Sequence, residues 1–345
     1  MKIFEHGGQI YNSQGFAENF LDFSANINPL GLSDNVIQTL QNNFAGIVNY
    51  PDSNATELKN SITRRYHVRQ DNLILLNGAA EFFYLYCNVF RPKKILIPVP
   101  SFSEYQRATK SSDCEIEFFY THAENNFELD INKLLAKNAD SIIIGRPNNP
   151  TGNLISVENI LKLAEKFSVV VDESFIDFLD VQSARNFISK KIFVVQSLTK
   201  IFAIPVLRLG FAVSDKNFSD KLNLAKDVWN VNFLAQKVGV AALSDEKYLR
   251  DTRDWLTVEK KFFVEKLSEL PIKIFMPTVN FILIRFDSKD LAQVVLKKLA
   301  EKKILVRDCS NFIGLDERYL RLAIRSHDEN LKLLCALKNI LEEFI

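Results

Sequence analysis

The stretch Ile192-Phe193-Val194-Val195-Gln196-Ser197-Leu198-Thr199-Lys200 joins an apolar, β-branched run to a polar end. The apolar run predicts a strand that is buried on both faces. Lys200 follows this strand and is flanked by the hydroxyl residues Ser197 and Thr199. A lysine in this position can bond an aldehyde cofactor covalently, while the hydroxyls and the guanidinium of Arg208 hold the cofactor's phosphate. The alternative is an exposed lysine in a loop, and the rest of the chain has to decide between the two.

Further β-branched runs precede this one and alternate with helical stretches such as 80–90 and 156–167. These runs cover residues 72–76, 94–98, 141–145 and 168–171. Strands that alternate with helices predict an α/β fold with a mostly parallel sheet and helices on both faces. Ligands of such sheets bind beyond the carboxyl ends of the strands, so a site is expected there.

The pattern changes after residue 210, where two long helices, about 219–242 and 245–270, are expected. The elements that follow are strands at 279–286, 304–307 and 319–324, a helix at 288–302 and a C-terminal helix from about residue 328. They predict a smaller α+β domain. We therefore expect a large domain at 45–220, and a second part that combines an N-terminal arm, 1–44, with the small domain, 221–345.

The composition is that of an ordinary globular enzyme. The chain has 345 residues, and its 43 basic side chains nearly cancel its 42 acidic ones. This balance argues against a protein that binds nucleic acid or an anionic membrane. No apolar run approaches the roughly 18 residues of a membrane span, so a cytoplasmic protein is expected. The four cysteines are widely spaced, which indicates reduced core thiols and gives little reason to expect disulfides or a metal site.

The other predicted strands also end in residues with suitable chemistry. Asn77-Gly78-Ala79-Ala80 places small residues at a helix start, where free N–H groups bind phosphate. Phe102 lies where a ring can stack on a planar cofactor. Asn149 lies in a rigid turn between two prolines, and Asp172 ends an apolar strand, where a carboxylate needs a cationic partner such as a protonated ring nitrogen. Together with Lys200, these strand ends describe a pyridoxal 5′-phosphate (PLP) site.

Each of these residues has a simpler interpretation when taken alone. A glycine relieves strain in a turn, a phenylalanine packs in the core, and an aspartate caps a helix. Their occurrence at successive strand ends is what favours a cofactor.

In their order along the chain, the motifs resemble those of the fold-type I aminotransferases over nearly the whole length. The shared motifs are Gly-Ala-x-Glu at 78–81, Asn-Asn-Pro-Thr-Gly at 148–152, Asp-Glu at 172–173 and Ser-x-Thr-Lys at 197–200. The resemblance implies the fold of these PLP-dependent enzymes and a homodimer whose active sites are shared between subunits. It also implies that Lys200 bonds the cofactor, that Asp172 binds the ring nitrogen and that Asn149 binds the ring hydroxyl.

The resemblance assigns the remaining cofactor contacts as well. Phe102 stacks on the ring, and Tyr50 reaches the phosphate bound by the neighbouring subunit. The phosphate is otherwise held by Gly78, Ala79, Ala80, Ser197, Thr199 and Arg208. Three residues depart from the family pattern: Ala80 stands where threonine is frequent, Arg146 where an asparagine begins the proline-asparagine motif, and Val206 where glycine is usual.

Within this superfamily the chain resembles most the L-threonine-O-3-phosphate decarboxylases of cobalamin biosynthesis. The likeness lies in His-Gly-Gly at 6–8, Asp-Phe-Ser-Ala-Asn-Ile-Asn-Pro-Leu-Gly at 22–31, Asp-Glu-Ser-Phe-Ile-Asp-Phe at 172–178 and Val-Arg-Asp-Cys-Ser-Asn-Phe at 306–312. Histidinol-phosphate aminotransferase is the neighbouring branch and the alternative. Phe175 favours the decarboxylase, because the aminotransferases usually place there a tyrosine that bonds the ring oxygen. A module that kept the fold without activity is disfavoured, because all the cofactor residues are present.

Both branches act on a phosphorylated amino compound, for which the resemblance implies binding residues. Arg321 is expected to bind the α-carboxylate, with Arg325 as the substitute in this role. The substrate phosphate is assigned to Arg307, His6, Asn26 and Asn28. The decarboxylase would convert L-threonine O-3-phosphate, or L-serine O-phosphate, to the amino-alcohol phosphate. Decarboxylation requires the bond from Cα to the carboxylate to be perpendicular to the cofactor plane, whereas transamination requires the Cα–H bond there. The sequence does not show that orientation.

Overall fold

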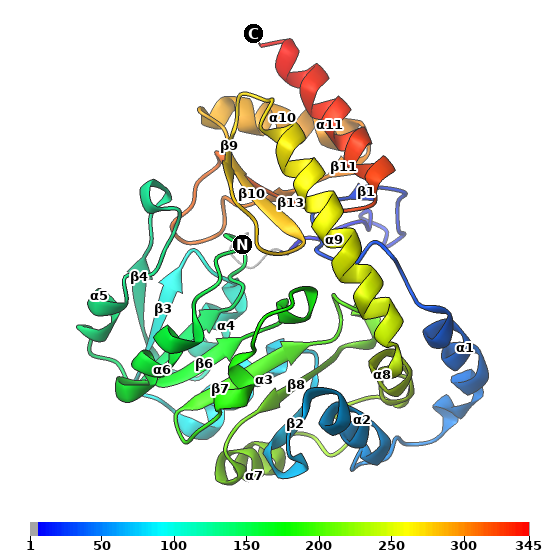
Figure 1. Ribbon diagram of the computed structural model, residues 1–345, viewed down its shortest axis with the longest axis vertical. Coiled ribbons are helices and arrows are strands. Elements are labelled where there is room, and N and C mark those ends of the chain that lie inside the picture. Colours follow the sequence, from blue (N-terminus) through cyan, green and yellow to red (C-terminus); the bar gives the residue numbers. More distant parts are fainter. Residues whose placement is uncertain (1–5, 345) are drawn as a thin grey trace.

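The computed structural model describes residues 6–344, which fold around two main β-sheets (Figure 1). The strands are β1 (Leu21–Asp22), β2 (Leu73–Asn77), β3 (Lys94–Val99), β4 (Glu115–Tyr120), β5 (Ser141–Gly145), β6 (Ser168–Asp172), β7 (Ile192–Ser197), β8 (Leu209–Val213), β9 (Lys273–Phe275), β10 (Phe281–Arg285), β11 (Ile304–Leu305), β12 (Arg307–Asp308) and β13 (Tyr319–Ala323). The α-helices are α1 (Asp34–Asn43), α2 (Thr56–Tyr66), α3 (Ala80–Phe90), α4 (Ser103–Lys110), α5 (Ile131–Leu135), α6 (Val157–Lys166), α7 (Lys216–Ala225), α8 (Phe233–Ser244), α9 (Glu246–Leu267), α10 (Lys289–Glu301) and α11 (His327–Glu342).

The larger sheet has seven strands in the order β2-β8-β7-β6-β5-β3-β4. β8 runs antiparallel to β2 and β7, whereas the other neighbours pair in parallel. The predicted α/β fold with a mostly parallel sheet is therefore confirmed. The sequence analysis did not predict β4 or β8. β4 is an edge strand in which glutamates alternate with apolar residues, and β8 is interrupted by Gly210, so neither reads as a continuous β-branched run.

Alternate residues of the buried strands pack on opposite faces of this sheet. Ile143 of β5 shares a hydrophobic cluster with residues of α3, α4 and α7. Its neighbours Ile142 and Ile144 belong to a second cluster with residues of α5 and α6. Because helices cover both faces, a ligand reaches the sheet at the strand ends.

The smaller part is built on a four-stranded antiparallel sheet of order β12-β13-β10-β9. α10 and α11 join its hydrophobic core through residues such as Val295 and Leu337. The N-terminal segment also belongs here, because β1 pairs in parallel with β11. The long helix α9, yellow in Figure 1, runs from the lower part of the molecule to this sheet. The domain limits at residues 45 and 220 remain a prediction.

Three expectations about this half of the chain were wrong. The single helix at 219–242 is broken, because Asn230 donates its amide to the Leu75 carbonyl at 2.9 Å and Asn232 caps the start of α8. The strand at 304–307 is divided into β11, which pairs with β1, and β12, which pairs with β13. Of the cysteines, Cys335 is exposed and is not a core thiol.

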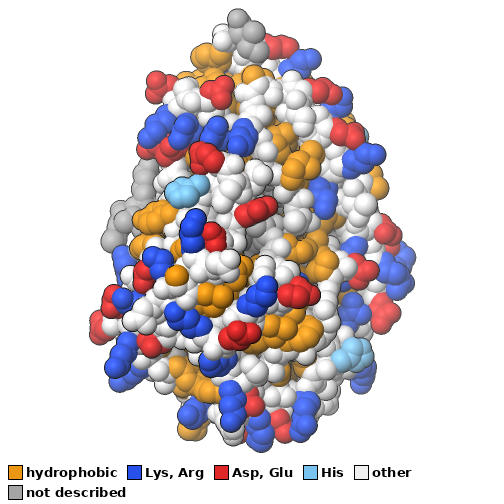
Figure 2. Space-filling view, turned by 60° about the vertical axis from the view of Figure 1, so that its left-hand side comes forward, with side chains coloured by type: hydrophobic (Ala, Val, Ile, Leu, Met, Phe, Trp, Pro, Cys, Tyr) orange, Lys and Arg blue, Asp and Glu red, His pale blue; other side chains and the backbone are white. Residues whose placement is uncertain are grey.

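The surface carries charges of both signs. Figure 2 shows acidic and basic side chains intermixed over one face, with hydrophobic side chains in small groups between them. Among residues 6–344, no helix combines the length and the apolar character that a bilayer span requires.

Candidate active site

A cavity of about 680 Å³ lies at the carboxyl ends of β6 and β7 and extends to β12 and β13 of the smaller part. Segments distant in sequence meet around it, because the parallel strands end at one edge of the sheet. Most of the predicted site residues line it: His6, Asn26, Ala79, Ala80, Phe102, Asn149, Asp172, Ser197, Lys200, Arg208, Arg307 and Arg321.

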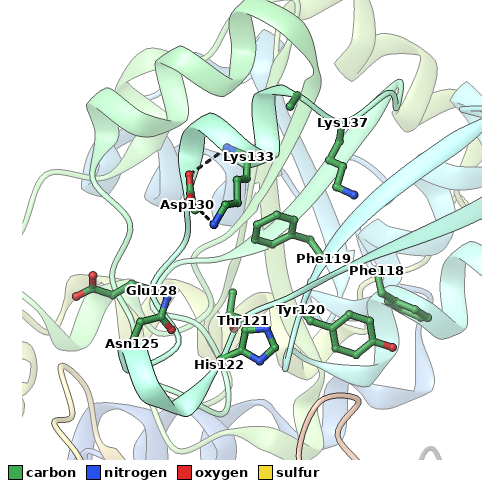
Figure 3. Close-up of a pocket in the computed structure, with 11 residues that line it drawn as sticks. Phe118, Phe119, Tyr120, Thr121, His122, Asn125, Glu128, Asp130, Lys133 and Lys137 are labelled. Atoms are coloured by element: carbon green, nitrogen blue, oxygen red, sulfur yellow. Dashed lines mark hydrogen bonds and ion pairs between the residues drawn. The ribbon is translucent and has the colours of Figure 1, made fainter.

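A second hollow, of about 610 Å³, lies against β4 and α5 (Figure 3). Both of its lysines form ion pairs: Lys133 Nζ lies 3.2 Å from Asp130 Oδ2, and Lys137 Nζ lies 3.0 Å from Glu117 Oε1. None of the predicted site residues lines it. The cavity at the strand ends is therefore the candidate active site.

Lys200 lies in the loop after β7, and its Nζ donates a hydrogen bond to Ser197 Oγ at 3.2 Å. Burial lowers the pKa of Lys200 to about 8. The attraction of Asp172 opposes this shift, whereas the guanidinium groups of Arg208 and Arg321 add to it. A neutral amine is the form that attacks an aldehyde, so this environment prepares Lys200 for covalent bonding near neutral pH.

Arg208 and the start of α3 form one corner of the cavity. Gly78 has a φ of +77°, and a Cβ at this residue would lie 2.3 Å from Arg208 Nη2. A glycine is therefore required for the guanidinium to approach the backbone this closely. Ala79 and Ala80 follow and line the cavity. The N–H groups of the helix start and the guanidinium of Arg208 therefore face the same space, and both kinds of group bind phosphate.

The hydroxyl groups of Ser197 and Thr199 lie 2.7 Å apart and share a hydrogen bond. Ser197 lines the cavity, whereas Thr199 is buried and does not. Gly78 is also absent from the lining. These two predicted phosphate ligands therefore support their neighbours: Gly78 admits Arg208, and Thr199 orients Ser197.

Asp172 ends β6 with its carboxylate buried at the cavity wall. The Tyr105 hydroxyl donates to its Oδ2 at 2.7 Å, and the Ser174 N–H donates to its Oδ1 at 2.9 Å. The ring of Phe102 lies 5.7 Å from the Tyr105 ring and 5.5 Å from the His6 ring. The sequence analysis missed Tyr105, although its spacing of three residues from Phe102 at a helix start places both side chains on one side of α4.

Arg321 connects three segments of the chain. Its Nη1 donates to Asn149 Oδ1 at 2.5 Å, and its Nη2 donates to the Ser24 carbonyl at 2.6 Å. Burial lowers the pKa of Arg321 to about 10, so the side chain still carries its charge near neutral pH. Arg307 is its direct partner across the β12–β13 ladder, which places two buried guanidinium groups side by side at the cavity.

Two buried polar atoms of the lining residues have no hydrogen-bond partner in the part of the chain that the structure describes. They are Arg321 Nε and Asn26 Oδ1. Buried polar atoms are normally paired, so such atoms in a cavity wall indicate a polar ligand. Arg321 Nε is a donor and is suited to an anion, whereas Asn26 Oδ1 is an acceptor and requires a donor group of the ligand.

His6 is held in the cavity by a carboxylate. His6 Nε2 lies 2.9 Å from Glu104 Oε1, and Glu104 Oε2 accepts a hydrogen bond from the Tyr84 hydroxyl at 2.8 Å. Burial acts to raise the pKa of Glu104, but these two contacts and the charge of Arg107 outweigh it, so that pKa lies below its usual value. A carboxylate that stays charged keeps the N-terminal segment in place.

Two residues assigned to the substrate do not lie in the cavity. The Asn28 amide donates to the Ile201 carbonyl and to Thr252 Oγ1, both at 2.8 Å. Asn28 therefore connects the N-terminal segment to the Lys200 loop and to α9, and its amide is not available to a phosphate. Arg325, the substitute for Arg321, pairs with Glu329 at 2.7 Å and is likewise not among the lining residues. The burial of Asn28 beneath the Lys200 loop could not be seen from its alternation with Asn26.

Arg146 and Glu173 form a buried ion pair next to Asp172. Arg146 Nη1 lies 2.7 Å from Glu173 Oε1, and Arg146 Nε donates to the Ile155 carbonyl. Burial raises the pKa of Glu173, against the contacts with Ser183, Ala184 and this guanidinium. Arg146, which departs from the family pattern, therefore supplies a cation to the buried carboxylate next to Asp172.

Comparison with known proteins gives the family. The model for aminotransferase class I and II matches residues 18–337. The chain belongs to this aminotransferase family. It is similar to the threonine-phosphate decarboxylase of Salmonella typhimurium, with 34% identity over 97% of this chain and 96% of the relative. A protein of Caldanaerobacter subterraneus with the provisional name threonine-phosphate decarboxylase is 37% identical over 99% of this chain and 95% of its own.

A solved structure supports the assignment to this family. The histidinol-phosphate aminotransferase from Clostridium acetobutylicum has a TM-score of 0.86 and 31% identity, and the match covers 93% of this chain and 99% of that one. The predicted fold-type I architecture is thereby confirmed. The protein is therefore an enzyme of the PLP-dependent aminotransferase superfamily, and PLP is its cofactor.

The residues that line the cavity are chemically suited to the groups of PLP. Lys200 can bond the aldehyde, and Arg208 with the start of α3 can hold the phosphate. Asp172 offers a buried carboxylate to a protonated ring nitrogen, and Phe102 offers a ring face. The individual contacts remain predictions of the family resemblance.

The environment of Lys200 predicts an unusual pH dependence. In the apoprotein, modification of Lys200 by an amine-specific reagent is expected to rise about tenfold per pH unit from pH 6 and to level off above about pH 8. Ordinary lysines keep gaining reactivity until about pH 10.4. Peptide mass spectrometry after brief labelling measures the profile, with the exposed Lys302 as the internal control. Identical profiles for the two lysines would contradict the described environment.

The buried ion pair predicts a large loss of stability for Arg146→Asn. This variant restores the usual family residue but leaves Glu173 buried without its cation, which costs about 3–5 kcal/mol of unfolding free energy. Denaturant unfolding measures the loss. The control is Arg318→Asn, which breaks the partly exposed pair with Asp316 and should cost less than about 1 kcal/mol. Equal small losses in both variants would contradict the role of the pair.

Proposed function

We propose that this enzyme decarboxylates L-threonine O-3-phosphate to the amino-alcohol phosphate used in cobalamin biosynthesis. The observation that carries the proposal is the pair of buried guanidinium groups, Arg307 and Arg321, opposite one another on paired strands at the cavity. A substrate with both a carboxylate and a phosphate matches two adjacent cations, because each anion accepts a bidentate hydrogen-bonded pair. L-serine O-phosphate carries the same two anions and lacks a methyl group, so it is a second candidate substrate.

PLP supplies an electron sink that stabilises the negative charge left on Cα when a bond to that carbon breaks. The protein decides which bond breaks through the position of the carboxylate. We assign that position to Arg321, whose guanidinium is held by Asn149 and by the Ser24 carbonyl and therefore has little freedom. Lys200, with a pKa of about 8, is able to give or accept a proton near neutral pH.

Phe175 supports decarboxylation over transamination. Its ring is buried, lines the cavity and lies 5.7 Å from Lys200 Nζ, with Phe281 packed edge-on at 5.1 Å. A tyrosine at this position would offer the cofactor oxygen a hydrogen bond of roughly 0.5–1.5 kcal/mol, which this chain does without. The relatives named as threonine-phosphate decarboxylases match over nearly their whole length, which also favours this reaction.

The His6–Gly8 segment supports a phosphate-bearing substrate. His6 lines the cavity beside Phe102 and is held by Glu104, and Asn26 lines the same cavity. We assign the substrate phosphate to Arg307, His6 and Asn26. The alternative function is a histidinol-phosphate aminotransferase, which the TM-score of 0.86 with the Clostridium acetobutylicum enzyme favours.

Two assays distinguish these functions. Purified enzyme with L-threonine O-3-phosphate is expected to release carbon dioxide, and with histidinol phosphate and 2-oxoglutarate it is expected to form no glutamate. Lys200→Ala is the control, and it should lose carbon dioxide release because the covalent bond to the cofactor is absent. Glutamate formation without carbon dioxide release would replace the decarboxylase proposal by the aminotransferase one.

We further propose a homodimer in which Tyr50 contributes to the partner's active site. The Tyr50 side chain is 78% exposed and stacks on Trp229 with ring centres 4.4 Å apart. Val206, at the rim of the cavity, is 84% exposed, and Val48 is 83% exposed. Exposed apolar side chains are typical of a surface that another subunit covers.

Subunit complementation tests the shared site. Lys200→Ala and Tyr50→Ala homodimers should each have little activity, with Tyr50→Ala reduced about tenfold or more. A heterodimer of the two variants has one site with both native residues, and about half of the wild-type activity per dimer is expected. Differently tagged, co-expressed subunits provide this heterodimer for assay. Activity no greater than the mean of the two parents would contradict the contribution of Tyr50.

A further inference from the structure

Tyr105 is the direct hydrogen-bond partner of the aspartate that faces the cofactor. Its hydroxyl donates to Asp172 Oδ2 at 2.7 Å, and the side chain is 1% exposed. The ring packs edge-on against Phe83 at 4.8 Å and against Phe102 at 5.7 Å. The hydroxyl therefore has a fixed place, and it touches the carboxylate and not a neighbouring backbone group.

The adjacent strand leaves space for this contact. Gly145 at the end of β5 is the register partner of Asp172 on β6. A Cβ at Gly145 would lie 2.9 Å from the Asn148 Cα and 3.3 Å from the Tyr105 hydroxyl, so a side chain there would press on both groups. Burial and the charge of Asp172 both raise the pKa of Tyr105 well above its usual value, so it stays a donor.

Both oxygens of Asp172 are thereby held, Oδ2 by Tyr105 and Oδ1 by the Ser174 N–H. Two donors on different oxygens fix the plane of a carboxylate, and a fixed plane determines where its remaining lone pairs point. We propose that Tyr105 is a positioning residue that aligns the Asp172 carboxylate with the cofactor's ring nitrogen. The Tyr105 ring also packs against Phe102, so it connects the Asp172 carboxylate to the ring that is expected to stack on the cofactor.

This proposal rests on PLP in the cavity with its ring nitrogen at Asp172, and it holds for decarboxylation and transamination alike. A purely structural tyrosine offers the contrast. Tyr86 is buried in the same hydrophobic cluster, and its hydroxyl bonds to Ser141 Oγ at 2.6 Å, away from Asp172. Tyr86→Phe is therefore the matched control for Tyr105→Phe.

The test compares the binding of PLP with that of its 1-deaza analogue, in which carbon replaces the ring nitrogen. Dissociation constants of both ligands are measured with the wild-type apoprotein and with Tyr105→Phe, Tyr86→Phe and Asp172→Asn. The readout is the preference for PLP, the ratio of the two constants, to which only contacts with the ring nitrogen contribute. Thermal unfolding of each apoprotein reports whether it is folded.

Tyr105→Phe is expected to lower the preference for PLP by about tenfold or more, since it removes a hydrogen bond to a charged group. Tyr86→Phe is expected to leave the preference unchanged, even if it weakens both ligands equally. Asp172→Asn should abolish the preference. An unchanged preference in Tyr105→Phe, or an equal fall in Tyr86→Phe, would overturn the proposal. An unchanged preference in Asp172→Asn would overturn the assignment of Asp172 on which it rests, whichever reaction the enzyme performs.

Discussion

Burial of charge around one cavity is the constraint on which this site depends. Burial lowers the pKa of Lys200 and that of Arg321, and the guanidinium groups of Arg208 and Arg321 lower the pKa of Lys200 further. The result is a lysine with a pKa of about 8 and an arginine with a pKa of about 10. An anionic ligand relieves the repulsion between these cations, so the cavity is suited to phosphate and carboxylate groups before any particular substrate is considered.

The same charges connect the two parts of the molecule. Arg321 comes from β13 of the small sheet, yet it donates to Asn149 at the end of a large-sheet strand and to Ser24 of the N-terminal segment. Asn28 binds the Ile201 carbonyl and Thr252 of α9, so the N-terminal segment is also fixed beneath the Lys200 loop. A group that binds Arg321 is therefore positioned relative to Lys200 through direct contacts and not through the distant helix alone.

The cofactor residues do not choose the reaction, because decarboxylation and transamination use the same lysine, aspartate and phosphate cradle. The choice depends on how the substrate's Cα bonds lie relative to the cofactor plane. Under the proposed function, the residues that control that orientation are Arg307, Arg321, Phe175 and His6, all of which line the cavity. They come from separate regions of the sequence, and all of them have to hold the substrate in the same orientation for one reaction to occur.

The sequence by itself determined the parallel sheet, because β-branched runs buried on both faces have a local signature. It also predicted that Lys200, Asp172 and Asn149 line a site, because each lies at or shortly after the end of such a run. It did not determine β4, whose exposed edge interrupts the apolar pattern, or the break between α7 and α8, where Asn230 bonds to the distant Leu75. Only the tertiary structure decided that Asn26 faces the cavity while Asn28 bonds to α9, since two amides on one side of an extended segment look alike until their partners are present. Tyr105 and the Arg146–Glu173 pair were likewise decided by contacts between distant segments. The local sequence does not show these contacts, because only the fold brings the partner to each side chain.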